Sequence, residues 1–182
     1  MKKIEKSFKD FKTLFEKHKV TIEEKVEERL VMHIDSYLSE LFECISRCES
    51  PVEKLFAIEL HQELSKSLFN HFPHYIQWSS QKEVTLFEGL NKEVTYRLDF
   101  VIEYHNHTTN TDYLFAIEID GHEFHQKTKE QVKRDKERDR NLMLNGITVI
   151  RFTGSEVYKN PYKCASEAMD IVGNYILNLY RN

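Results

Sequence analysis

Three carboxylates stand at the ends of two apolar segments in this 182-residue chain. Asp99 interrupts the apolar run 98–102, and Glu118 and Asp120 flank an isoleucine at the end of the run 113–119. Because side chains alternate along a strand, Glu118 and Asp120 are expected on the same side of theirs. If the two runs pair as neighbouring strands, Asp99 comes close to both.

Carboxylates gathered in this way repel one another and have raised pKa values unless a divalent cation keeps them ionised. Such oxygen ligands suit Mg²⁺ or Mn²⁺, which keep waters for chemistry. A plainer interpretation exists for each acid alone, since an acid at a strand end is often a turn residue or an ion-pair partner, and Asp120 precedes a glycine. Acids in both runs, with histidines directly after the second, favour a metal site.

The elements that must position these acids follow from residue patterns. Short runs rich in β-branched and aromatic residues predict strands at 75–78, 83–87, 94–102, 113–119 and 147–152. Helical patterns predict helices from residue 50 to about 68, from about 128 to 145 and from about 161 to 179. The polar segment 106–112 is predicted to be a hairpin loop. This order indicates an α/β fold with a mixed sheet covered by helices on both faces.

The first 49 residues are predicted to be a separate N-terminal helical segment. Apolar residues recur at helical spacing in residues 4–15, and a capping-box pattern at Thr21 and Glu24 starts a second amphipathic run. The two helices are expected to join near residues 18–20. The pair could pack on the main domain, form a homodimer or contact another partner, and the sequence leaves these alternatives open.

The cysteines and the hydropathy indicate a cytoplasmic protein with no membrane association. The chain has three cysteines, and neither a CxxC pair nor an even number is present, which argues against a disulfide framework and a structural zinc site. No apolar run is long enough to span a bilayer, and charges interrupt the N-terminus too often for a signal peptide.

Charge distribution matters more than the net charge of −4, which on its face disfavours nucleic acid. Residues 127–140 are basic and follow directly after the acidic site. On a helix, one entirely basic stripe is predicted to contact phosphates, and it consists of Lys129, Lys133, Lys136 and Arg140. The alternative is a solvated helix face held by internal ion pairs.

Several short motifs follow one another along residues 50 to about 172. They are Ser50-Pro51-Val52-Glu53, Arg97-Leu98-Asp99-Phe100-Val101, Glu118-Ile119-Asp120-Gly121, His125, Asp135-Lys136-Glu137-Arg138-Asp139, Leu142, Gly146 and Val149-Ile150-Arg151-Phe152. In order and spacing they resemble the very-short-patch-repair-like branch of the PD-(D/E)XK nucleases. The resemblance implies a three-layer α/β/α restriction-endonuclease-like fold, with a nuclease-like domain at residues 50–182 behind the N-terminal helical pair.

The resemblance also implies roles for the carboxylates. Asp99 matches the central metal-binding aspartate, and Glu118 matches the second carboxylate of the motif. The usual lysine of the superfamily would fall at position 120, where this chain has Asp120. All three are therefore expected to be catalytic and to bind the metal. The missing lysine leaves the general base open.

This branch pairs such an aspartate with a downstream histidine and a further acid, and His125 and Asp135 match them. His125 could orient or deprotonate the attacking water, with His122 as the competing candidate. Glu53 matches a first-helix glutamate of the site, although it also completes a capping pattern with Ser50. Asp135 could instead pair with an arginine on its own helix.

The expected function is a metal-dependent endonuclease that hydrolyses phosphodiester bonds of DNA with Mg²⁺ or Mn²⁺, leaving 5′-phosphate and 3′-hydroxyl ends. RNA stays open as a substrate. Two alternatives come from other classes. One is a catalytically inactive nucleic-acid-binding module of the same fold, and the other is an interaction protein acting through the N-terminal helices.

Overall fold

The structure is a computed structural model, and it describes residues 24–66, 74–89, 92–121 and 128–181. The chain divides into two compact units, Met1–Glu40 and Leu41–Asn182. Helix α2 (Glu24–Arg47) runs through the boundary, and the first helix of the predicted N-terminal pair lies outside the described residues. Across the described ranges, no helix has the length and apolar character needed to cross a membrane.

In the described part of the second unit, the centre is a mixed four-stranded sheet in the order β1-β2-β3-β4. The strands are β1 (His74–Glu88), β2 (Lys92–Asn106), β3 (Thr111–Asp120) and β4 (Ile147–Thr153). The first three are antiparallel neighbours, whereas β3 and β4 are parallel. Helix α4 (Lys129–Leu144) lies between β3 and β4 in the chain and allows the parallel connection.

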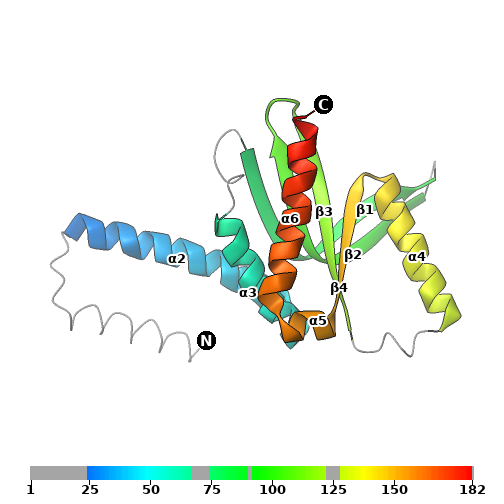
Figure 1. Cartoon of the computed structure of the whole chain (residues 1–182), viewed down its shortest axis with the longest axis horizontal. Helices are drawn as coiled ribbons and strands as arrows, with labels where there is room; N and C mark the ends of the chain where they lie inside the picture. The colour runs from blue at the N-terminus through cyan, green and yellow to red at the C-terminus, as the bar shows by residue number, and fades with distance from the viewer. Residues whose placement is uncertain (1–23, 67–73, 90–91, 122–127, 182) are drawn as a thin grey trace. The chain divides into compact units, whose positions relative to one another are not determined.

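Helices cover both faces of the sheet, which confirms the predicted three-layer α/β/α arrangement (Figure 1). Helices α3 (Pro51–Lys66), α5 (Gly154–Lys159) and α6 (Pro161–Leu179) share one buried cluster with the sheet. On the other face, Leu142 of α4 packs in a smaller cluster with Leu98, Val101 and Ala116. The helices predicted near residues 50, 128 and 161 are therefore confirmed, with small changes at their ends.

Two details differ from the sequence prediction. The strands expected at 75–78 and 83–87 form one strand, β1, because pairing with β2 resumes after Gln81, whose φ is 50°. The short helix α5 was not expected, and a capping box between Thr153 and Glu156 begins it directly after β4. The polar residues between the two expected strands coincide with the irregular backbone conformation of Gln81, which lies within a single strand.

Strands β2 and β3 part close to Asp99. Their pairing runs from the hairpin only as far as Phe100 and Ile117, whereas β1 stays paired with β2 through to Lys92. Beyond this point, the backbone groups of β3 no longer pair with those of β2. Main-chain donors of β3 therefore become available to side chains at the level of the candidate acids.

We predict that Phe56→Ala destabilises the second unit strongly. Phe56 is fully buried in α3, with its ring centroid 5.1 Å from that of Phe100 and 5.9 Å from that of Phe152. Its loss leaves a cavity between helix and sheet and should cost roughly 3–5 kcal/mol in urea unfolding. The neighbouring Leu55→Ala, at a side chain 38 % exposed, should cost less than about 1 kcal/mol. Equal losses would contradict the described packing.

Candidate active site

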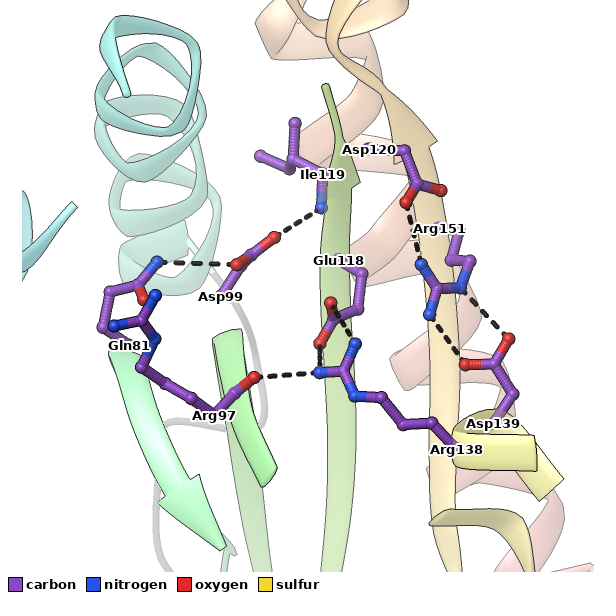
Figure 2. A network of polar contacts seen from close by, with 9 residues as sticks. All are labelled: Gln81, Arg97, Asp99, Glu118, Ile119, Asp120, Arg138, Asp139 and Arg151. Atoms are coloured by element: carbon purple, nitrogen blue, oxygen red, sulfur yellow. Dashed lines mark hydrogen bonds and ion pairs between the residues drawn. The ribbon is translucent and has the colours of Figure 1, made fainter. Parts of the chain in front are cut away.

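Asp99 fills the gap between β2 and β3 with its side chain (Figure 2). Its Oδ2 accepts the backbone N–H of Ile119 at 2.8 Å, and its Oδ1 lies 3.5 Å from the amide nitrogen of Gln81. Burial raises the pKa of Asp99, the Ile119 N–H opposes that shift, and the nearby charge of Glu53 adds to it. The carboxylate is thus fixed in place by β3 and is costly to ionise.

Glu118 is the most buried of the candidate acids, at 5 % exposure, and it is held by an arginine of α4. The Arg138 guanidinium donates to both carboxylate oxygens, at 3.0 and 2.7 Å, in the fork geometry that arginine makes with carboxylates. A third bond at 2.9 Å reaches the carbonyl oxygen of Arg97. Burial raises the pKa of Glu118, and the hydrogen bonds and charge of Arg138 oppose that shift.

Asp120 belongs to a second ion-pair network. Its Oδ1 accepts Nη1 of Arg151 on β4 at 3.0 Å. The same guanidinium donates to both oxygens of Asp139 on α4, at 3.2 and 2.7 Å. Figure 2 shows this network beside the one around Glu118, each with one arginine bridging a strand and α4. The carboxylate at the usual lysine position is therefore turned toward a fixed positive charge.

Glu53 both begins α3 and reaches the candidate site. Its N–H donates to the hydroxyl of Ser50 at 3.1 Å, as the predicted cap requires, and its Oε2 accepts the N–H of Glu49, the residue before Ser50, at 2.9 Å. The same Oε2 accepts the amide of Gln81 at 2.9 Å. Glu53 is only 8 % exposed, so one buried side chain both contacts Ser50 and binds Gln81, which faces Asp99.

The structure brings three of the predicted site acids close together. Asp99, Glu118 and Glu53 lie close enough that the charge of Asp99 raises the pKa of Glu118 and the charge of Glu53 raises that of Asp99. Asp135 is half-buried on α4. Arg138, the arginine of the same helix with which Asp135 could have paired, is bound to Glu118. His125 and its competitor lie outside the described residues.

The predicted basic stripe of α4 is fully on the solvent side of the helix. All four members, Lys129, Lys133, Lys136 and Arg140, are exposed. Nζ of Lys133 lies 3.8 Å from Oε1 of Glu137. Part of the stripe therefore makes an ion pair within the helix, as expected of a solvated face. At 3.6 residues per turn, the stripe is roughly opposite to Arg138 on the helix. The stripe therefore faces away from Glu118, the acid that Arg138 binds.

Four side chains of the networks were given no site role from the sequence: Gln81, Arg138, Asp139 and Arg151. Arg151 carried a usable signal, because it interrupts an apolar strand in the same way as Asp99 does. Arg138 is one of seven cations in residues 127–140, and only the packing of α4 distinguishes it from the others. Gln81 had no signal, since it stood in a presumed break between strands.

The donor chemistry at Asp99 and Glu118 fits a hard divalent cation. Asp99 is half-buried and Glu118 is buried, and the two lie on adjacent strands. Burial raises the pKa of each, and a cation would offset that cost of ionisation. Within the described ranges, no group of three or more His, Cys, Asp or Glu residues is close enough to hold a metal ion. Arg138 supplies the positive charge that Glu118 meets in this structure.

Comparison with known proteins supports a nuclease-like domain. The model of a restriction endonuclease-like family, described as REase_MTES_1575, matches residues 89–171. The matched span contains Asp99, Glu118, Arg138 and Arg151. No curated protein and no solved structure gives a significant match. The match supports a nuclease of the PD-(D/E)XK-type superfamily. Restriction endonuclease-like proteins typically use divalent metals.

We predict that Asp99→Asn gains stability relative to wild type as pH rises, in the absence of divalent metal. Because burial raises the pKa of Asp99 in the folded state, its stabilising contribution is fully present below the unfolded pKa and is lost as pH rises through the folded pKa. The asparagine oxygen can still accept from Ile119. Chemical unfolding in EDTA from pH 4 to 8 measures the difference.

The matched control is Asp170→Asn, at an exposed acid on α6. Its stability difference from wild type should stay flat over the same range. A flat difference for Asp99→Asn, or one of opposite sign, would show that burial does not control the ionisation of Asp99.

Proposed function

We propose that this chain is a divalent-metal-dependent endonuclease that hydrolyses phosphodiester bonds of DNA. The observation that carries the proposal is the pair of carboxylates, half-buried Asp99 and buried Glu118, at the point where β2 and β3 part. The match of residues 89–171 to a restriction endonuclease-like family supports the reaction class. Mg²⁺ or Mn²⁺ suits this oxygen donor set.

Asp99 and Glu118 are the residues proposed to hold the metal. When bound there, a divalent cation supplies the charge that polarises the scissile phosphate and lowers the pKa of an attacking water. Asp99 needs no rearrangement for this role, because the Ile119 N–H occupies one oxygen and leaves lone pairs on both. Glu118 must share its oxygens with Arg138, whose guanidinium can then turn to a phosphate oxygen.

The attacking water needs a proton acceptor, and Asp120 is poorly suited to that role. Its Oδ1 accepts Nη1 of Arg151, so the carboxylate is turned toward β4 and not toward Asp99 (Figure 2). We therefore assign the proton to His125 or to a phosphate of the substrate. Asp120 serves as a further metal ligand only when its carboxylate turns away from Arg151.

The finer assignment to the very-short-patch-repair-like branch rests on the pattern Glu118-Ile119-Asp120-Gly121 with His125 and Asp135 downstream. In this proposal, Asp135 is a supporting acid of the site on α4. DNA is the favoured substrate, with RNA as the variant to be compared, and the cytoplasm is the proposed compartment.

A second candidate function is a nucleic-acid-binding module without catalysis. It is favoured by one observation: Arg138 neutralises Glu118 by binding both of its oxygens, so this acid is compensated without a metal. Such a module would bind DNA equally with and without divalent cations. Cleavage and binding measured on the same protein separate the two functions.

We predict that plasmid DNA is nicked or cut with Mn²⁺ or Mg²⁺ and not with EDTA. Asp99→Asn and Glu118→Gln should each lower the cleavage rate by at least about 100-fold, because each removes one charge that holds the cation. Glu93→Gln changes an exposed acid on the same strand as Asp99 and should cleave like wild type. Activity that survives both site substitutions would remove this site from the reaction.

Because the basic stripe of α4 faces away from Glu118, we propose that it contacts DNA only outside the cleavage position and takes no part in the chemical step. Replacing Lys129, Lys133, Lys136 and Arg140 together with glutamine should weaken binding, and the salt slope should fall by about 0.9 for each phosphate that the protein no longer neutralises. Fluorescence anisotropy between about 50 and 200 mM salt measures the slope. The control replaces four exposed lysines outside α4: Lys54, Lys92, Lys159 and Lys163. Equal effects in both variants would show that the stripe contributes only to the general positive charge of the protein and makes no specific contact with DNA.

A further inference from the structure

Three different groups around the gap between β2 and β3 contact the guanidinium of Arg138. It donates to both oxygens of Glu118, at 3.0 and 2.7 Å, and to the carbonyl oxygen of Arg97 at 2.9 Å (Figure 2). Its central carbon lies 5.8 Å from the centre of the Tyr96 ring, within the range of a cation–π contact. The hydroxyl of that ring accepts from the amide of Asn141 on α4 at 3.3 Å. The carbonyl and the ring can therefore keep the guanidinium in place when Glu118 takes another partner.

The hydrogen bonds of Arg138 use only part of its donor capacity. A guanidinium carries five N–H donors, and the bonds to Glu118 and to the carbonyl of Arg97 come from Nη1 and Nη2 alone. Within the described ranges, Nε donates to no protein acceptor. The side chain is 22 % exposed, so a ligand can approach it from solution. Arginine binds phosphate oxygens well, which makes Arg138 suited to an anion beside the two acids.

The charge of Arg138 acts on both acids of the candidate metal site. It is bound directly to Glu118, and it also opposes the rise in the pKa of Asp99 that burial causes. A cation between these acids would meet the same positive charge at short range, and in a partly buried site such repulsion is strong. The guanidinium that compensates Glu118 in the free protein thus disfavours a cation there until a negative group binds the guanidinium. A phosphate of DNA is such a group.

We propose that Arg138 couples cation binding to DNA binding: it binds Glu118 in the free protein and donates to a phosphate once DNA is present, which leaves Glu118 available to the cation. This inference rests on the proposed metal-dependent nuclease function and assigns its regulation to one side chain. Because such coupling is reciprocal, DNA raises the affinity for the cation as much as the cation raises the affinity for DNA. A solely structural Arg138 would leave this coupling unchanged when it is replaced.

The first test measures Mn²⁺ binding by the full chain without DNA, using electron paramagnetic resonance. Arg138→Gln removes the competing charge and keeps an amide donor near Glu118, so it should bind Mn²⁺ at least about tenfold more tightly than wild type. Arg134→Gln is the matched control, because Arg134 is an exposed arginine one turn earlier on α4. Its Mn²⁺ affinity should stay within about twofold of wild type, since solvent screens an exposed charge.

The second test measures the coupling itself. A non-cleavable duplex DNA is added, and the Mn²⁺ that the DNA binds alone is subtracted. The increase in Mn²⁺ affinity should be at least about fivefold larger in wild type than in Arg138→Gln. On cleavable plasmid at saturating Mn²⁺, Arg138→Gln should be about 100-fold slower than wild type, because tighter cation binding does not replace the lost phosphate contact.

A second variant covers the case in which Arg138→Gln does not fold, since removing the partner of a buried acid is destabilising. Arg138→Lys keeps the positive charge but lacks the planar fork of arginine. Its Mn²⁺ affinity without DNA should stay within about threefold of wild type, because the competing charge is still present. The increase caused by DNA should be at least about fivefold smaller than in wild type, since lysine cannot hold a phosphate in the same geometry.

Each outcome decides between the proposals. Mn²⁺ binding by Arg138→Gln that is no tighter than by wild type, or an equal increase with DNA in wild type and variant, overturns the role of Arg138 and leaves the nuclease proposal intact. Absence of Mn²⁺ binding by wild type and variants, with and without DNA, overturns both.

Discussion

The site depends on how two carboxylates, half-buried Asp99 and buried Glu118, are compensated at the point where β2 and β3 part. Asp99 receives the N–H of Ile119, which β3 can no longer give to the backbone of β2. Glu118 receives Arg138. A buried carboxylate left without such partners is costly, so strand, helix and side chain must all be in place together. The gap between the two strands is thus stabilised by the same acids that lie beside it.

Helices on both faces of the sheet contribute side chains around these carboxylates. Helix α4 is anchored by buried Leu142, and its arginine links Glu118 to the carbonyl of Arg97, so it spans the gap between the two strands. Helix α3 brings Glu53 from the opposite layer, where Phe56 of the same helix packs in the main core. Each helix therefore contributes an apolar anchor and at least one charged side chain. Packing and electrostatics fix the same geometry.

Much of the fold was predictable from local pattern, and the pairing of polar side chains was not. The period of apolar residues located the sheet and the helices α3, α4 and α6, because burial of one face imposes that period. Asp99 and Glu118 were detectable since charges are rare within buried strands. The partners Arg138 and Arg151 depend on which face of α4 meets the sheet. The bridge by Gln81 depends on one irregular backbone position in β1. His125, predicted to act on the water, lies outside the described residues.

The central claim is that Asp99 and Glu118 hold a divalent cation that acts on a phosphodiester. The most direct measurement is anomalous X-ray scattering from crystals of the full chain grown with Mn²⁺ and a non-cleavable DNA analogue. The account predicts an anomalous peak in coordination contact with carboxylate oxygens of both residues and with a phosphate of the DNA. A saturating Mn²⁺ concentration that leaves this position empty, or a peak bound elsewhere on the chain, would contradict it.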